Sequence, residues 1–266
     1  MRCEHPSLRQ GLIRAWCPSL GASGLTLIDR SGSNAHGTLT GMAGKDNWQA
    51  SGSGVALNFD GVGAPLASNN QHVACGAVLP GAFTYSAWCY LRTFGSGKCV
   101  HGGVSTEVYL PIFTSTSTFV QSGAGSRTFA GAIPLLKWSH CCVTRQADNL
   151  GSVFIDGVTS TTAPQTVPGT FTLNALGRYA LNTGYLWDGL LDDIRIYGRA
   201  LTLSEIRLLA SRRGIGLQPL PDRAAGMPRK LFVNVGGTWR NGDAYVNTGS
   251  GWRLGVPFVN AGGTWK

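Results

Sequence analysis

The acidic side chains decide whether this chain could hydrolyse a sugar chain, because acid–base hydrolysis requires a pair of carboxyl groups. The chain of 266 residues carries 13 acidic side chains, and its glutamates are Glu4, Glu107 and Glu205. Two carboxyl groups about 5–5.5 Å apart on one strand would come from acids at positions i and i+2 or i+4. No glutamate has an acid at that spacing, and the adjacent Asp192 and Asp193 are expected to face opposite sides of a strand. The sequence therefore predicts no hydrolase.

Motifs for other enzyme chemistries are missing as well. The sequence has no G-x-S-x-G elbow and no phosphate-binding G-x-x-x-x-G-K-S/T loop. His140 precedes Cys141, but neighbouring residues of a strand diverge, so the two cannot act as base and nucleophile. His140 is therefore expected to be structural. We predict that the protein is not an enzyme.

The cysteines point to a reduced protein made in a cytoplasm. There are seven of them, with no C-x-x-C pair, and no secretory signal peptide precedes them. Cys141 and Cys142 are adjacent and would point to opposite faces of a strand, which disfavours a thiolate metal site. Most of these side chains are expected to be small buried apolar groups.

Composition predicts an all-β chain with many tight turns. Glycine is abundant at 38 residues, 43% of the residues are apolar and only 13% are charged. Asp156-Gly157 has the sequence of a hairpin turn, and Thr202 with Glu205 forms a capping-box pattern that predicts one short helix ending near Ser211. No apolar run approaches the ~20 residues of a membrane span, so membrane insertion is not expected.

Charge and proline content divide the chain into three parts. The formal net charge is +9, and residues 199–230 carry seven basic side chains against two acidic ones. This stretch is rich in proline and lacks interleaved aromatics, so it reads as a solvated linker or a strip that docks on an acidic partner, and nucleic-acid binding is not expected. The predicted parts are a domain over 1–210, a linker over 211–230 and a repeat module over 231–266.

The C-terminal module repeats one phrase three times. FVNVGGTWR, YVNTGSGWR and FVNAGGTWK begin at residues 232, 245 and 258, so the period is 13 residues. Each unit has two strand-like halves around a glycine turn, which predicts a β-hairpin that is marginal alone and gains a core by stacking with other copies. Two rows of aromatic residues are expected to form this oligomerising or anchoring surface: Phe232, Tyr245 and Phe258, and Trp239, Trp252 and Trp265.

Residues 8–210 contain a series of short motifs in a familiar order. They are GLIRAW (11–16), LIDRSGSNAHGTLTG (27–41), ALNFDG (56–61), FTYSAWCYL (83–91), KWSHCCVTR (137–145), SVFIDGV (152–158) and GLLDDIRIYGRALTLSEIRLL (189–209). Together they resemble the laminin G-like, concanavalin A-like jelly-roll family. The resemblance implies two antiparallel sheets packed face to face. Trp16, Trp88 and Trp138 would then be inward-facing anchors of the sandwich.

The resemblance also implies candidate ligand sites. Family members often hold calcium near the loop and late strand that match Asp29, Asn34 and Asp192 here, with backbone carbonyls completing the shell. The alternative is that Asp29 caps its own turn.

Glycan binding is expected from two loops, 62–72 and 180–188, whose side chains suit hydroxyl groups and sugar faces. The candidate residues are Asn69, Asn70, His72, Tyr185 and Trp187.

A jelly roll followed by these C-terminal repeats is similar to virion proteins of tailed bacteriophages. The resemblance implies a non-enzymatic structural protein that assembles into the virion in the host cytoplasm. Its jelly roll would face outward and its repeats would attach it to other virion proteins or to sister chains, with a trimer favoured. Two roles are open: a tail fibre or spike that contacts host surface glycans, or a capsid decoration protein. A soluble or surface carbohydrate-binding lectin or adhesin module is the alternative.

Overall fold

A computed structural model describes residues 5–42, 47–62, 71–95, 97–103, 108–179 and 185–217, and the backbone of short strands between 231 and 265. The chain forms two compact units, one holding Cys3–Gln218 and the other Met1–Arg2 with Pro219–Lys266. Among the described residues, no helix has the length and apolar character that crossing a bilayer demands.

The first unit contains two large sheets. Sheet A has the order β15 (Val158–Thr159), β14 (Leu150–Ile155), β13 (Trp138–Arg145), β7 (Phe83–Leu91), β18 (Asp188–Tyr197), β5 (Val55–Asp60) and β4 (Trp48–Ala50), with β1 (Leu12–Trp16) beside β18 and β16 (Gln165–Thr166) beside β14. Sheet B has the order β12 (Gly125–Ala130), β11 (Ser117–Ser122), β10 (Tyr109–Phe113), β9 (His101–Gly102), β17 (Phe171–Leu176), β6 (His72–Leu79), β3 (Gly37–Thr40) and β2 (Thr26–Leu27), with β8 (Lys98–Cys99) beside β10.

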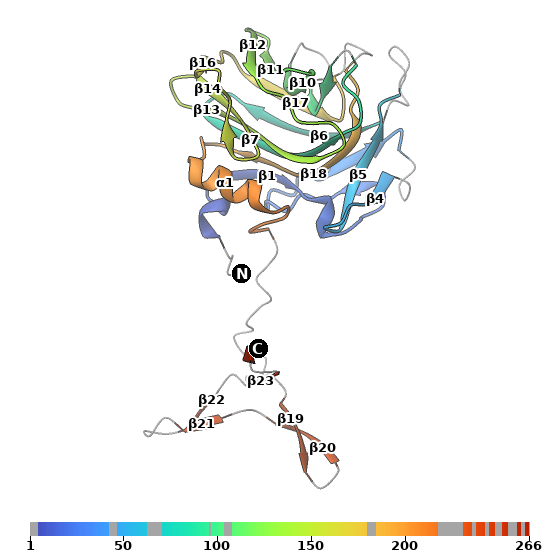
Figure 1. Ribbon diagram of the computed structural model, residues 1–266, viewed down its shortest axis with the longest axis vertical. Coiled ribbons are helices and arrows are strands. Elements are labelled where there is room, and N and C mark those ends of the chain that lie inside the picture. Colours follow the sequence, from blue (N-terminus) through green and yellow to red (C-terminus); the bar gives the residue numbers. More distant parts are fainter. Residues whose placement is uncertain are drawn as a thin grey trace. The chain divides into compact units, whose positions relative to one another are not determined.

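The two sheets pack face to face, as Figure 1 shows, and their strand pairs are antiparallel. Strands that are neighbours in a sheet are often far apart in sequence: β7 lies between β13 and β18 in sheet A. This arrangement confirms the predicted two-sheet antiparallel sandwich of the jelly-roll type.

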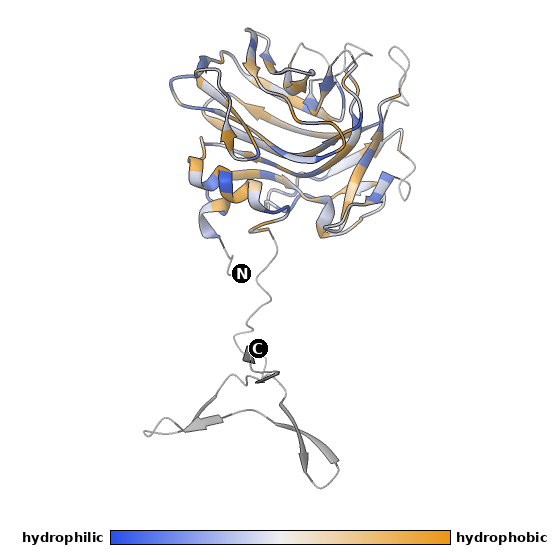
Figure 2. Cartoon of the chain, in the orientation of Figure 1, coloured by the Kyte–Doolittle hydropathy of each residue, from blue (hydrophilic) through white to orange (hydrophobic). Residues whose placement is uncertain are grey.

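Strict alternation of side chains explains how the strands build the core. Along β7, Phe83, Tyr85, Ala87, Cys89 and Leu91 all enter the cluster between the sheets, while the residues between them face outward. Hydrophobic segments, drawn in orange in Figure 2, run through the strands of the sandwich. The hairpin predicted at Asp156-Gly157 is confirmed, because both residues have positive φ (50° and 75°) between β14 and β15.

The tryptophans are distributed differently from the prediction. Trp16 lies in the core between the sheets, and so does Trp187. Trp88 and Trp138 are only partly buried and lie on the outer face of sheet A, so their assignment as inward anchors is wrong. The reason is that both faces of sheet A are covered in part, which leaves apolar residues on both sides of β7 and β13.

A layer of short segments covers part of the outer face of sheet A. Two 3-10 helices, η1 (Pro6–Arg9) and η2 (Pro18–Leu20), precede the single α-helix of the described residues, α1 (Leu203–Ser211). The predicted capping box is present in α1, where Thr202 and Glu205 bond reciprocally. Ile206 and Leu209 of α1 pack against outward-facing residues of sheet A, and Trp88 Nε1 donates to the Leu209 carbonyl at 3.2 Å.

The residues that follow α1 belong to the sandwich unit, which moves the predicted domain boundary. Ile215 and Leu217 are buried at 5% and 3% exposure, and Leu217 packs against Ala15 and Cys17. We call residues 212–217 the strap. The basic linker predicted from 211 therefore begins no earlier than 218, because apolar and charged side chains of the strap are bound to the sheet.

The second unit contains three two-stranded hairpins. They pair β19 (Leu231–Val235) with β20 (Thr238–Gly242), β21 (Tyr245–Asn247) with β22 (Trp252–Leu254), and β23 (Asn260–Ala261) with β24 (Thr264–Trp265). The register repeats, since the opposed pairs are Asn234 with Trp239, Asn247 with Trp252, and Asn260 with Trp265. This confirms one hairpin per 13-residue repeat. No strand described here pairs with a strand of another hairpin, and Phe258 lies outside the described residues.

Candidate functional site

A cleft on the outer face of sheet A is a candidate ligand site formed by residues that the structure describes. It has a volume of about 350 Å3, within the range of small-molecule pockets. Its lining comes from β4, the loop after β4 and the outward-facing positions of three other strands: Gln49, Ala50, Ser51, Gly52, Tyr90, Arg92, Trp138 and Leu190. The covering layer therefore leaves one part of this face open.

The floor of the cleft is a row of side chains placed by strand register. Tyr90 of β7 is paired with Trp138 on one side and with Leu190 on the other. Paired residues of antiparallel strands point to the same face, so the three side chains form one apolar strip across three strands. The rings of Tyr90 and Trp138 have their centroids 5.8 Å apart at 54°, and both remain partly exposed.

The polar side of the cleft is built around Arg92. Its Nη1 donates to the Phe59 carbonyl at 3.0 Å and its Nη2 donates to Asn58 Oδ1 at 2.6 Å. Its counterion is Asp188, with Nη1 to Oδ1 at 3.4 Å, and Asp188 also accepts from Thr93. The Arg92 side chain keeps 32% of its surface exposed, so it presents a fixed cation with donors at the edge of the aromatic strip.

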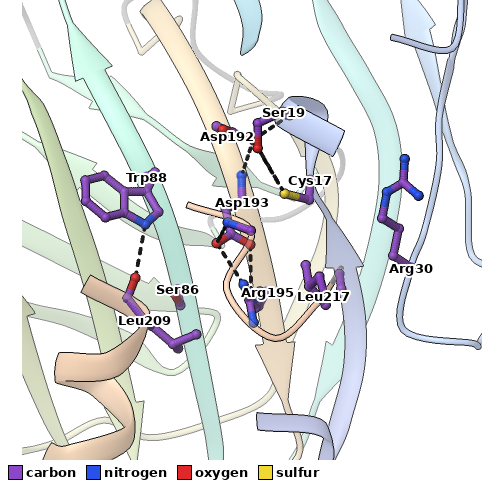
Figure 3. Close-up of polar contacts among 12 residues, drawn as sticks. Cys17, Ser19, Arg30, Ser86, Trp88, Asp192, Asp193, Arg195, Leu209 and Leu217 are labelled. Carbon is purple, nitrogen blue, oxygen red and sulfur yellow. Dashed lines mark hydrogen bonds and ion pairs between the residues drawn. The ribbon is translucent and has the colours of Figure 1, made fainter. Parts of the chain in front are cut away.

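A cluster of buried charges lies on the same face of sheet A (Figure 3). Asp193 accepts from Arg195 Nε and Nη2 at 2.7 and 2.8 Å and from the Gly214 amide at 2.7 Å. Burial alone disfavours the Arg195 cation, but the charge and hydrogen bonds of Asp193 raise its pKa above the usual range. This is a buried ion pair that ties β18 to the strap.

The neighbouring Asp192 faces the same layer, which corrects the expectation that the two aspartates diverge. A β-bulge lies between Asp192 and Arg195, and Asp193 has a φ of 46°, so the alternation is interrupted there. Asp192 Oδ1 accepts from the amides of Ser19 and Asp193 at 3.1 and 2.8 Å. Burial, followed by the charge of Asp193, raises the pKa of Asp192 to about 6. Both aspartates are buried, with 0% and 1% of their surface exposed to solvent.

The residues expected to hold calcium do not fit a cation. Both oxygens of Asp29 accept hydrogen bonds: Oδ1 from the amides of Ala15 and Ser31, and Oδ2 from the Ala35 amide and the Ser31 hydroxyl. These donors occupy the lone pairs that a metal would need. The second acid of the set, Asp192, lies 3.5 Å from the Arg213 guanidinium, and the described residues contain no group of three His, Cys, Asp or Glu placed for a metal. Asp29 has the alternative role, which is to stabilise its own turn.

The structure describes three of the five residues predicted to bind a glycan. Asn69 and Asn70 lie outside the described residues. His72 lies at the start of β6 in sheet B, and Tyr185 contacts Tyr179, with ring centroids 6.1 Å apart. Trp187 is 1% exposed and packs against Phe113 in the core, so its assignment to a ligand-contacting loop is wrong. The described members of the set line no common cleft.

The thiols and histidines have the structural roles expected of them. Each cysteine from Cys17 onward is unpaired and buried, and Cys141 and Cys142 enter separate clusters on opposite faces of β13. His140 is buried and its Nε2 lies 2.8 Å from the Ser86 hydroxyl. Burial lowers the pKa of His140 to about 3 and the pKa of His101 to about 4, so both rings are neutral near pH 7.

Sequence reasoning missed the cleft because its residues come from distant segments. Tyr90 and Trp138 each lie in one of the motifs, where they read as strand residues, and Arg92 directly follows the motif that ends at Leu91. One signal was available: in FTYSAWCYL, Trp88 and Tyr90 share a face opposite to Phe83 and Tyr85. That alternation shows that β7 carries large aromatics on both faces, so one set of them had to lie outside the core.

Comparisons with known proteins agree with this architecture. Residues 66–207 match the family described as the concanavalin A-like lectin/glucanases superfamily. No curated protein matches the sequence. Among solved structures, domain 4 of an extracellular arabinanase from Geobacillus stearothermophilus, in complex with arabinotriose, superposes with a TM-score of 0.55 at 19% identity. That match covers 75% of this chain and 98% of the domain.

Two other solved structures share the fold. A Trypanosoma rangeli sialidase superposes with a TM-score of 0.52 at 19% identity, over 75% of this chain and 32% of the sialidase chain. The binding domain of Paraclostridial Mosquitocidal Protein 1 gives a TM-score of 0.53 at 14% identity, over 76% of this chain and 52% of that one. At these identities the likeness concerns the fold, and the family match covers more than half of the chain. The chain belongs to the concanavalin A-like lectin/glucanases superfamily.

Proposed function

We propose that the sandwich is a carbohydrate-binding module that holds a saccharide in the sheet A cleft. The observation that carries this proposal is the strip of Trp138, Tyr90 and Leu190 beside the fixed donors of Arg92. Sugar rings present C–H faces that pack on aromatic rings and hydroxyl groups that need donors and acceptors. A cleft with an aromatic floor and a polar edge answers both needs.

Binding without hydrolysis is the form of this proposal that fits the carboxylates. None of the residues that line the cleft is acidic, and Asp188, at its edge, is engaged by Arg92 and Thr93. Glycoside hydrolysis ordinarily needs a pair of carboxyl groups flanking the bond. The arabinotriose complex of the arabinanase domain supports a saccharide as the ligand. This domain and the mosquitocidal binding domain share only the fold with this chain.

Replacing Trp138 with alanine is expected to weaken saccharide binding by at least about tenfold, because a buried aromatic anchor contributes about 2 kcal/mol or more. Native gels containing arabinan, xylan, mixed-linkage β-glucan or polygalacturonate measure this as loss of retardation. Tyr185→Ala is the matched control, since Tyr185 is a partly exposed aromatic that does not line the cleft and is one of the five residues that the sequence predicts to bind a glycan. Loss of binding in Tyr185→Ala with binding intact in Trp138→Ala would contradict the proposed site.

A virion attachment or decoration role is a second candidate, favoured by the repeated register of the C-terminal hairpins. Two-stranded hairpins are marginally stable in water, so three copies of one hairpin are suited to packing with hairpins of sister chains or of other virion proteins. In this role the sandwich would display the saccharide site and the hairpins would anchor it.

This anchoring role predicts a difference in size between two forms of the protein. The full chain is expected to be an oligomer, with a trimer favoured, and a truncated chain ending at Leu217 is expected to be a monomer. Light scattering coupled to gel filtration gives both masses. The truncation keeps the strap and every described residue of the sandwich unit. If both forms contain the same number of protomers, the anchoring role is contradicted.

A further inference from the structure

Arg213 of the strap reaches from the covering layer into the wall of the cleft. Its Nη1 donates to the Ser51 hydroxyl at 2.9 Å and its Nη2 donates to the Ser51 carbonyl at 2.6 Å. Its guanidinium lies over the indole of Trp138, with 4.1 Å from Cζ to the ring centroid. Ser51 and Trp138 both line the cleft, so one side chain contacts its wall and its floor.

The wall that Arg213 contacts is a tight loop with one other support. The Ser51 amide donates to the Gly54 carbonyl at 2.9 Å, which closes residues 51–54 into a turn. Gly54 has a φ of 110° and packs so closely on Ser19 that an added Cβ would lie 2.5 Å from the Ser19 carbonyl oxygen. The loop is therefore fixed at Gly54 by η2 and at Ser51 by Arg213.

Asp192 interacts with both groups that hold this loop, the Ser19 segment and Arg213. Its Oδ1 accepts from the Ser19 amide, and its Oδ2 lies 3.5 Å from Arg213 Nη1. The Arg213 side chain is 7% exposed and that of Asp192 is 0% exposed, so the pair is shielded from solvent. A buried guanidinium with a counterion, two bonds to one residue and a ring beneath it has little rotational freedom.

We infer that Arg213 is a positioning residue for saccharide binding: it sets the Trp138 ring and the 51–54 loop in the geometry that the ligand meets. This inference rests on the proposed function. Only arginine has the planar fork that can bond twice to Ser51 while its flat face covers the indole. The strap thus determines affinity without contacting the ligand, since Arg213 is not among the residues that line the cleft.

The experiment compares Arg213→Lys with Arg207→Lys in the full chain. Lysine keeps the charge opposite Asp192 but loses the planar fork, while Arg207 is an exposed residue of α1 and serves as the matched control. The first readout is fluorine NMR of protein labelled with 5-fluorotryptophan, in which Trp138→Phe identifies the Trp138 resonance among the eight tryptophans. The second readout is retardation by whichever of the four named polysaccharides retards the wild type most.

Arg213→Lys is expected to shift or broaden the Trp138 resonance in the ligand-free protein and to weaken polysaccharide binding about five- to tenfold. Arg207→Lys is expected to do neither. Urea unfolding of both variants confirms that each binding measurement is made on folded protein. If Arg213→Lys matches Arg207→Lys in either readout, the inference is overturned. If no polysaccharide retards the wild type, the proposed function fails, and the Trp138 resonance alone decides whether Arg213 positions the ring.

Discussion

Replacing Asp193 with asparagine is expected to lower the free energy of unfolding by about 3–5 kcal/mol, because it leaves the Arg195 guanidinium buried without a counterion. The Arg195 side chain is 0% exposed, and its Nη1 has no hydrogen-bond partner among the residues that the structure describes. Asparagine is close in size to aspartate and tolerates the left-handed φ of 46° at this position. The expected loss of stability therefore comes from removal of the negative charge, with little contribution from backbone strain.

Urea unfolding of two further variants checks the cause. Asp148→Asn changes an exposed aspartate that also accepts a backbone amide, and it is expected to cost less than about 1 kcal/mol. Adding Arg195→Met to Asp193→Asn is expected to restore part of the loss, because no unpaired charge then remains in the interior. A loss below about 1 kcal/mol in Asp193→Asn alone would mean that water or another group compensates Arg195.

Acidification from about pH 7 to about pH 5 is expected to destabilise the protein through its buried histidines. The pKa is about 4 for His101 and about 3 for His140 in the folded protein, against about 6.5 in an unfolded chain. The unfolded state therefore takes up protons first as pH falls below about 6.5, and the folded state loses relative stability until its own pKa values are reached. At pH 5 each histidine accounts for a loss of about 2 kcal/mol.

Asp192 acts in the opposite direction over part of this window. Its folded pKa of about 6 lies above the unfolded value of about 3.9, so the folded state gains a proton first and recovers about 1 kcal/mol by pH 5. The net expected loss is about 3 kcal/mol, measured by urea unfolding at several pH values. His140→Gln is expected to reduce the pH dependence by about half of the histidine contribution. An unfolding free energy that is constant from pH 7 to pH 5 would show that these rings are not held neutral.

The strands are predictable because they depend on local patterns, whereas the sandwich is implied by the resemblance of the ordered motifs to a known family. Alternation in FTYSAWCYL and the capping box at Thr202 each follow from residues a few positions apart, and both are present in the structure. Alternation shows which residues share a face, but it does not show which face is the inner one. Trp88 and Trp138 were placed inside for that reason, although α1 and Arg213 contact them on the outside.

The candidate site could not be predicted because it depends on pairing between distant strands. Tyr90, Trp138 and Leu190 meet only through the register of β7 with β13 and β18. The bulge after Asp192 is another such feature, since nothing in GLLDDIRIY shows where the alternation breaks. Acids at suitable motif positions predict calcium. In the structure, however, amides of the folded chain donate hydrogen bonds to Asp29 where a metal would bind. The second unit was predictable because each hairpin is local.

The order of attachments along the strap decides how tension would enter the sandwich. A pull on the chain beyond residue 218 meets the packing of Leu217 on Ala15 and Cys17, then the Gly214 amide on Asp193, then Arg213 on Ser51. These bonds load one after another, as in peeling, whereas antiparallel strands sheared along their length load together. Such a pull would thus strain the Arg213 contacts, and with them the cleft on sheet A, before any strand of sheet A is drawn out.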